Sequence, residues 1–391
     1  MTTKRILLAA WCFPFFGLGC DVNVPFGGND TFESVEDAVR DLQDAFTEAV
    51  ADPLGARPFP VLIGGDDQTV YYATSLTDVR LRFPGPTTDV VFPSFVGPSN
   101  LYKFEESRRE LIAPLVPGGA YSGLATDGRF VVYALADVHG SNPFSPYVFD
   151  LWSSATKPLL ENGADESAYM DTIVVHGGRA AFAMYDETED GFAPKIRVAD
   201  LEFEEPTIEI ELSFGTLDVP LAMRGDRLAY VDGPSGGSLQ VLLRDLTSGE
   251  TTVVADGIRA EYAPSVPVFL TDNGVVWSEP GVAGPSRVQR YIIQTGATSV
   301  WSDGVRGVLA GATDEHFVTE EFVVGESDTP DRWLVRKYNA NGSSRKLAGF
   351  RADGLAGQTR VIGNRAAWVN PDREIVLAPL SGGERNSFRP F

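Results

Sequence analysis

The chain has 391 residues, of which 43% are hydrophobic and 11% aromatic. This is enough apolar surface to build a packed core, which excludes a globally disordered protein. The formal net charge is −22, from 32 basic and 54 acidic side chains. A surface of that charge repels phosphate backbones and anionic lipid headgroups, so no nucleic-acid partner is expected.

An export signal is predicted over residues 1–19. Lys4 and Arg5 precede an apolar run over residues 6–18, and this run ends in small residues. The run is too short to span a bilayer as a helix. A basic start, a short apolar stretch and a small-residue cleavage site are typical of a signal peptide.

The end of this segment, Gly17-Leu18-Gly19-Cys20, resembles a bacterial lipobox. The resemblance implies cleavage before Cys20 and attachment of lipid to it, although the leucine stands closer to the cysteine than in the usual pattern. Cys12, the only other cysteine, would be removed with the signal, so no disulfide is expected in the mature chain. We therefore expect an exported protein that is lipid-anchored in the bacterial cell envelope, at the periplasmic face or the outer membrane. The alternative is an ordinary secretory signal with an incidental cysteine.

Two segments are expected between the signal and the main domain. Residues 20–30 contain glycines and a proline without periodicity, which predicts a lipidated tether. Residues 31–52 are predicted to form an amphipathic helix that ends before Pro53. Its apolar face consists of Phe32, Val35, Val39, Leu42, Phe46 and Ala49. We expect this helix to pack on the side of the following domain or to close one of its ends, with partner binding as the alternative.

A short turn of Gly, Asp or Asn followed by an apolar run recurs seven times, roughly 40 to 60 residues apart. The copies lie at residues 67–71, 127–131, 177–181, 225–229, 272–276, 314–318 and 363–367. A period of this size with several short strands per unit is typical of propeller blades. The sequence therefore predicts an all-β fold, a seven-bladed β-propeller of four-stranded blades over residues 58–391.

The predicted strand order bears on how the ring closes. Residues 59–63 would form the innermost strand of the first blade, and residues 386–391 the outermost strand of the last. Neither terminus then completes a blade begun by the other, so closure would rest on packing between whole blades. The alternative is that residues 22–26 add an edge strand to the last blade.

The turn at residues 245–250, Asp-Leu-Thr-Ser-Gly-Glu, and the apolar strand after each repeated turn resemble the TolB-like, WD-repeat-like group of periplasmic propellers. The resemblance spans about residues 58–391, although no blade carries the Trp-Asp pair of eukaryotic WD repeats. It implies the architecture and leaves the function open, because such propellers range from binding scaffolds to enzymes.

Few residues carry recognisable chemistry. His176 and His316 are expected in first turns of different blades and His139 at the opposite rim, so no histidine-based zinc site is expected. The sequence shows no nucleophile elbow, P-loop or dinucleotide fingerprint.

Basic residues stand just after the first turn in five of the seven repeats. They are Arg129, Arg179, Arg227, His316 and Arg365. Such a set could form an anion-binding ring, but in so acidic a protein we expect each arginine to pair with a neighbouring carboxylate.

The connections between second and third strands are expected to be the longest and to gather acidic and aromatic residues at one rim, where propellers usually bind. The candidate binding residues are Asp137, Tyr185, Asp186, Asp190, Phe192, Glu320, Glu321 and Phe322. Within residues 186–191 oxygen-bearing side chains alternate ahead of a glycine, as in calcium loops, but the later acidic ligand is missing. No cofactor is therefore expected, with calcium near Asp186 and Asp190 as the alternative.

The function expected first is that of a non-catalytic envelope lipoprotein. Its propeller would be a monomeric scaffold that binds an envelope protein or a cell-wall glycan through the long-loop rim. The alternative is a hydrolytic propeller enzyme that cleaves glycans or other bonds with two rim carboxylates. No catalytic pair can be singled out among the 54 acidic residues.

Overall fold

The computed structural model describes residues 59–75, 100–105, 107–114, 120–136, 145–159, 173–188, 191–203, 206–213, 219–233, 237–259, 266–279, 286–323, 332–351 and 359–390. The predicted signal peptide, tether and helix lie outside these residues, as do Cys20 and residues 22–26. The described residues contain no apolar helix of membrane-spanning length.

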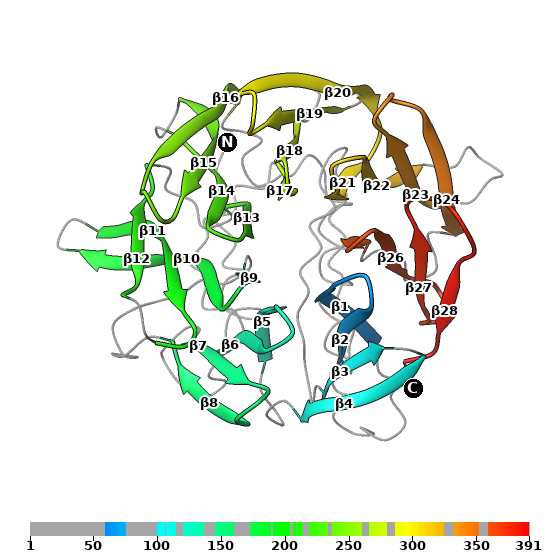
Figure 1. Ribbon diagram of the computed structural model, residues 1–391, viewed down its shortest axis with the longest axis horizontal. Coiled ribbons are helices and arrows are strands. Elements are labelled where there is room, and N and C mark those ends of the chain that lie inside the picture. The colour runs from blue at the N-terminus through cyan, green and yellow to red at the C-terminus, as the bar shows by residue number, and fades with distance from the viewer. Residues whose placement is uncertain are drawn as a thin grey trace, which may run out of the picture.

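The described residues form seven antiparallel four-stranded sheets arranged in a ring (Figure 1). Each sheet is one blade and is built from four consecutive strands. The predicted all-β, seven-bladed propeller is thereby confirmed.

The strands of blades 1 to 4 are, in order, β1 (Phe59–Gly65), β2 (Thr69–Ser75), β3 (Asn100–Glu105) and β4 (Arg108–Pro114); β5 (Ala120–Thr126), β6 (Phe130–Ala136), β7 (Ser145–Asp150) and β8 (Ala155–Pro158); β9 (Ile173–His176), β10 (Arg179–Thr188), β11 (Gly191–Asp200) and β12 (Ile208–Glu211); and β13 (Leu221–Arg224), β14 (Arg227–Asp232), β15 (Ser238–Asp245) and β16 (Thr251–Arg259).

Those of blades 5 to 7 are β17 (Val268–Leu270), β18 (Gly274–Glu279), β19 (Ser286–Ile292) and β20 (Ala297–Val305); β21 (Val308–Ala312), β22 (His316–Val323), β23 (Arg332–Asn339) and β24 (Ser344–Arg351); and β25 (Arg360–Ile362), β26 (Arg365–Val369), β27 (Ile375–Pro379) and β28 (Asn386–Phe388).

Each repeated turn of the sequence leads into the second strand of a blade. In β26 the residues from Ala366 to Val369 are all buried, and in β18 those from Gly274 to Ser278. These strands are apolar without alternation because a neighbouring blade covers each of their two faces. Glycine is required in some of these turns: Gly177 and Gly178 have φ values of 60° and 78°, as a two-residue hairpin turn with both central residues left-handed demands.

The hydrophobic core lies between adjacent blades. One cluster joins Phe130 and Val148 of blade 2 to Phe182 and Met184 of blade 3. The equivalent cluster between blades 6 and 7 contains Trp368, which is 2% exposed. Since each interface buries side chains from two blades, no blade has a complete core of its own.

Blades 7 and 1 meet at what we call the closure interface. Val61 and Leu62 of β1 share a buried cluster with Ile362 and Ala367 of blade 7. Farther out, the ring of Phe388 in β28 stacks on that of Phe104 in β3, with centroids 3.6 Å apart and the planes at 4°.

Polar contacts tie the same interface. The main-chain N–H of Asn364 donates to Oδ1 of Asp67 at 2.5 Å, and Nη2 of Arg365 donates to the carbonyl of Asp66 at 2.6 Å. The guanidinium of Arg109 in β4 donates to the carbonyl of Pro390. No strand is exchanged between these two sheets in the described residues. The alternative, an edge strand from residues 22–26, stays a prediction because those residues lie outside the described part of the chain.

Candidate functional site

The antiparallel order of the strands gives the ring two rims. The connections between first and second strands and between third and fourth strands lie at one end of each blade, and we call this end the turn rim. The connections between second and third strands lie at the other end and form the loop rim. The loop rim is where the binding residues predicted from the sequence are expected.

Part of the predicted set lies in strands. Tyr185 and Asp186 belong to β10, Phe192 to β11 and Phe322 to β22, while Asp137 and Asp190 lie outside the described residues. Strands β10 and β11 stay paired as far as Thr188 and Gly191. The expected loop over residues 184–195 is therefore mostly a paired hairpin of β10 and β11.

Glu320 and Glu321, which were expected in a loop, lie within the strand β22, which continues to Val323. Glu321 is 3% exposed, and its Oε1 accepts hydrogen bonds from Nε of Arg336 at 2.9 Å and from the hydroxyl of Tyr338 at 3.1 Å. Its carboxylate is thus engaged inside blade 6. Oε2 of Glu320 accepts a hydrogen bond from the main-chain N–H of Thr359 at 3.3 Å, which links blade 6 to the start of blade 7.

No cluster of three or more His, Cys, Asp or Glu side chains able to hold a metal ion occurs among the described residues. Asp186 pairs with Ala193 across the β10–β11 ladder, whereas a calcium loop of the EF-hand type winds around its ion. The calcium hypothesis stays a prediction, since Asp190 lies outside the described residues.

On the turn rim, arginines reach forward to the next blade of the ring. Nη1 of Arg179 in blade 3 contacts Oδ1 of Asp226 in blade 4 at 2.7 Å. Arg224 of blade 4 contacts Asp272 of blade 5 at 2.6 Å, and Arg365 of blade 7 makes the bond to blade 1 described above. Such exposed contacts contribute only about 0.5 kcal/mol each. They link adjacent blades at the turn rim.

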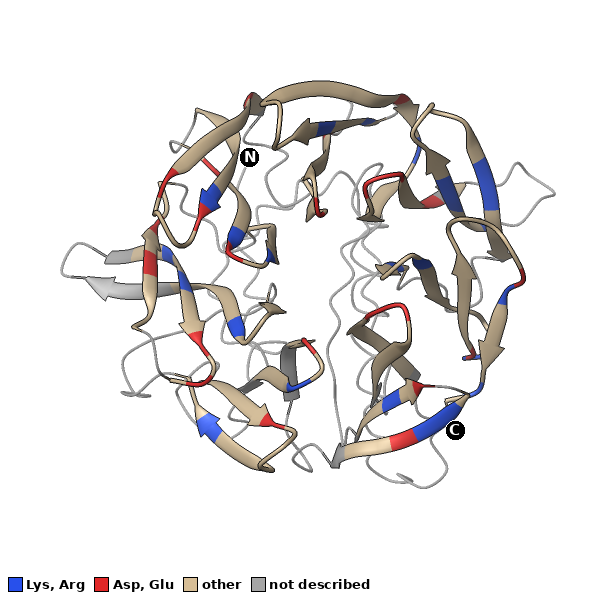
Figure 2. Ribbon diagram, in the orientation of Figure 1, with Lys and Arg blue, Asp and Glu red and all other residues tan. Residues whose placement is uncertain are grey.

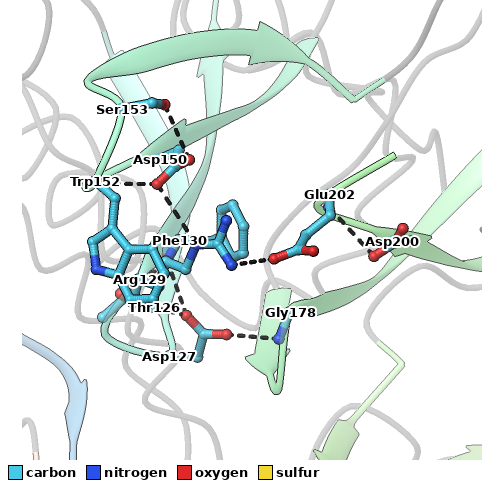
Figure 3. A network of polar contacts seen from close by, with 10 residues as sticks. All are labelled: Thr126, Asp127, Arg129, Phe130, Asp150, Trp152, Ser153, Gly178, Asp200 and Glu202. Carbon is cyan, nitrogen blue, oxygen red and sulfur yellow. Dashed lines mark hydrogen bonds and ion pairs between the residues drawn. The ribbon is translucent and has the colours of Figure 1, made fainter. Parts of the chain in front are cut away.

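Arg129 makes the most extensive of these contacts (Figure 3). Its guanidinium lies over the rings of Phe130 and Trp152, at 4.5 Å and 4.3 Å from their centroids, and pairs with Glu202 of blade 3. Nε also lies 3.8 Å from Oδ1 of Asp150. The charge of Arg129 is therefore matched by carboxylates on both sides, as expected from the acidic composition.

Asp150 and Asp127 complete this network (Figure 3). Burial would raise the pKa of Asp150, but hydrogen bonds from the main-chain N–H of Trp152 and from Ser153 outweigh this and lower it. Oδ2 of Asp127 accepts a hydrogen bond from the main-chain N–H of Gly178 at 2.8 Å, a second link from blade 2 to blade 3.

His176 forms the corresponding link from blade 3 to blade 4. Its Nδ1 accepts a hydrogen bond from the main-chain N–H of Gly225 at 3.0 Å. Burial, followed by the charge of Arg224, lowers the pKa of His176, while Asp127 and Asp272 act in the opposite direction. The neutral imidazole is therefore the form that the folded protein favours.

The free energy of unfolding should decrease as the pH falls below about 6.5, because the unfolded chain then binds the His176 proton more readily than the folded one. A His176→Asn variant keeps an acceptor near the position of Nδ1 and removes the titration. We expect its urea midpoint to change less than that of the wild type between pH 7.5 and 5.5. The pKa of His316 is also lowered, by burial and by the charge of Lys337. The urea midpoint of the variant should therefore still decrease somewhat as the pH falls. If the urea midpoints of the wild type and of His176→Asn changed equally with pH, this would contradict the contribution of His176 to the pH dependence of stability.

No hydrolytic triad is formed by the described residues. His176 contacts Gly225, His316 lies 3.9 Å from Glu315, and neither contacts a serine or cysteine side chain in this part of the chain. The pattern Gly-x-Ser-x-Gly does occur at residues 233–237. It connects β14 to the antiparallel strand β15, whereas a nucleophile elbow joins a strand to a helix.

No known family model matches the sequence. No curated protein matches it significantly either. Solved structures do match the fold. A prolyl endopeptidase aligns with 85% of this chain and 50% of its own, at a TM-score of 0.58 and 12% identity. A puromycin-hydrolysing peptidase from Mycobacterium tuberculosis aligns with 85% of this chain and 53% of its own, at a TM-score of 0.52 and 10% identity.

Two further matches are propellers of other kinds. The β-propeller domain of the Trilobed protease from Pyrococcus furiosus, described as having an open velcro topology, aligns with 69% of this chain and 83% of its own, at a TM-score of 0.50 and 13% identity. TolB from Acinetobacter baumannii aligns with 75% of this chain and 80% of its own, at a TM-score of 0.40 and 13% identity.

This chain spans about half the length of the two peptidases that it matches over 85% of its own length. These neighbours overturn the first functional expectation, a non-catalytic scaffold for an envelope protein or cell-wall component. The structures that share this fold are named as prolyl endopeptidases, puromycin hydrolases and an acylaminoacyl peptidase. At 10–13% identity the match itself establishes the propeller fold.

Proposed function

We propose that this propeller takes part in the hydrolysis of peptide-type amide bonds. The observation that carries the proposal is the match of 85% of the chain to about half of a prolyl endopeptidase and of a puromycin-hydrolysing peptidase. These neighbours favour amide bonds over the glycosidic bonds considered from the sequence. The cleaving group would come from outside the described residues, in which no triad is formed.

The loop rim is the surface that we propose to face the substrate. Asp186 and Glu187 belong to the strand β10 near that end of blade 3, and the other candidates are Asp137, Tyr185, Asp190, Phe192, Glu320 and Phe322. A rim rich in carboxylates attracts cationic peptides and repels acidic ones at low ionic strength. We therefore expect basic and neutral peptides to be preferred over acidic peptides.

The test compares amide hydrolysis by the purified full-length protein and by envelope extracts from cells with and without its gene. Fluorogenic amides of arginine, proline and glutamate are the probes. Turnover by the purified protein, or an activity that the extract loses with the gene and regains on complementation, supports the proposal. Failure of both assays overturns it, and a preference for the glutamate amide contradicts the role of the acidic rim.

We further propose that the protein is exported and anchored by lipid at Cys20. The support is the signal-like composition of residues 1–19 and the lipobox resemblance that ends at this cysteine. In detergent phase separation the wild type should enter the detergent phase and a Cys20→Ser variant the aqueous phase. A variant that still partitions with the detergent would refute lipidation at this position.

A further inference from the structure

The outer hairpin of blade 6, strands β23 and β24, is strongly basic in an acidic protein. Residues 332–351 contain six basic residues and no Asp or Glu, although the chain as a whole has a net charge of −22. Basic residues are visible on both strands in Figure 2. They are Arg332, Arg336, Lys337, Arg345, Lys346 and Arg351. We call this element the basic hairpin.

The register of the basic hairpin places like charges opposite each other. Arg332 pairs with Arg351, Arg336 with Lys346, and Lys337 with Arg345. Like charges directly opposite across two strands destabilise a sheet. Consistent with this crowding, burial and the charge of Arg345 lower the pKa of Lys337.

The equivalent strands of other blades are arranged in the opposite way. In blade 1, Lys103 pairs with Glu110, and their charged groups lie 3.1 Å apart. In blade 3, Arg197 pairs with Glu209, and their charged groups lie 2.6 Å apart. Charged side chains on an outer strand protect it from pairing with another sheet, but mixed charges do this without repulsion. Protection of the edge therefore does not account for the basic hairpin.

The protein compensates these charges only in part. Arg336 pairs with Glu321, and Nζ of Lys337 donates to the carbonyl of Leu380 at 2.6 Å. Arg332, Arg345 and Lys346 are exposed, and none of them forms an ion pair within the described part of the chain. Three cations thus remain available to a ligand.

We propose that the basic hairpin binds an acidic polypeptide segment of a partner protein. Strand β24 has eight residues and therefore extends over about 26 Å, the length of a similar number of extended residues in a partner. A narrow acidic segment meets the cations and little else. A nucleic-acid duplex or an anionic membrane is more extended and would also face the rest of a protein whose net charge is −22, which repels it. This interaction is independent of the proposed hydrolysis at the loop rim.

The test uses the full-length protein and a fluorescein-labelled octaglutamate peptide, followed by fluorescence anisotropy at 50 mM salt. An Arg345→Glu/Lys346→Glu double variant should bind the peptide at least about tenfold more weakly than the wild type. The matched control is Lys157→Glu/Arg287→Glu, which reverses the same number of charges on β8 and β19 and should change binding less than about twofold. An octaglutamine peptide should not bind.

The melting temperature distinguishes lost binding from misfolding. The Arg345→Glu/Lys346→Glu variant should melt no lower than the wild type, because it replaces two like-charge pairs with opposite-charge pairs. Equal losses of peptide binding in both double variants, or no binding by the wild type, would overturn the proposal. Tighter binding of phosphatidylglycerol vesicles or of an oligodeoxythymidine than of octaglutamate would also overturn it, in favour of a different anion.

Discussion

A Phe388→Ala variant is expected to lose about 3 kcal/mol of unfolding free energy. Phe388 belongs to the last strand, β28, and its ring stacks on Phe104 at a centroid distance of 3.6 Å and lies 5.8 Å from that of Tyr72. Both partners belong to blade 1, so the truncation removes packing across the closure interface. Because no strand is shared between blades 7 and 1, nothing in the described sheets replaces that packing.

Urea unfolding would give the loss of stability, and native-state hydrogen exchange would show where it acts. Amides of β1 and β25 should exchange faster in the variant, whereas those of β14 should change only as the global stability does. Phe203→Ala is the matched control, because Phe203 is 45% exposed on the turn rim and its ring contacts Lys157. We expect the control to lose less than about 1 kcal/mol. Similar losses in the two variants would contradict a special role for the closure interface.

Replacing Glu321 by alanine is expected to destabilise the protein by about 3 kcal/mol. The substitution removes the acceptor for Nε of Arg336 and for the hydroxyl of Tyr338, both of which lie in β23. The Tyr338 hydroxyl would then be buried without that acceptor, which adds a desolvation penalty. Glu321→Gln keeps an acceptor oxygen and should lose less.

Alkaline titration offers a second measurement at this site. Burial and the nearby Glu321 carboxylate raise the pKa of Tyr338 to about 12. The unfolded chain therefore releases this proton first, and stability should fall as the pH rises above about 10. In Glu321→Ala the pKa of Tyr338 should move down, since the negative charge beside it is gone. An unchanged tyrosine titration with unchanged stability would show that Glu321 is dispensable to the blade.

The architecture was predictable because each blade repeat is marked by residues that are close together in the sequence: a short turn and the apolar strand that follows it. The turn before each second strand, such as Gly177-Gly178, combines a conformational requirement with an apolar run of fixed length. Such patterns can be recognised in the sequence without knowing which residues are in contact in the folded protein. The assignment of the first and last strands followed from the same repeat, since Phe59 lies in β1 and Phe388 in β28, each within a complete blade.

The candidate site was less predictable because it depends on contacts between distant residues. Glu320-Glu321 reads as a loop in the sequence, yet Glu321 is buried by its pairing with Arg336 and Tyr338 of the next strand. The forward contacts of the turn rim, such as that from Arg129 to Glu202, join blades whose spacing along the chain varies. The like-charge register of the basic hairpin becomes visible only when β23 and β24 are aligned residue by residue. Function was the least predictable, since the repeat specifies a scaffold and no reacting group.

Because every blade is one uninterrupted stretch of chain, the order of the sheets around the ring does not depend on where the chain is cut. New termini placed between β8 and β9, with the old ends joined by a linker, would leave all seven sheets intact. In genetic terms, a blade can be duplicated, lost or exchanged as a single segment without breaking a sheet that two distant parts of the gene must build together. Propellers of this kind can therefore change their number of blades, or acquire a blade with an unusual surface such as the sixth, in one recombination event.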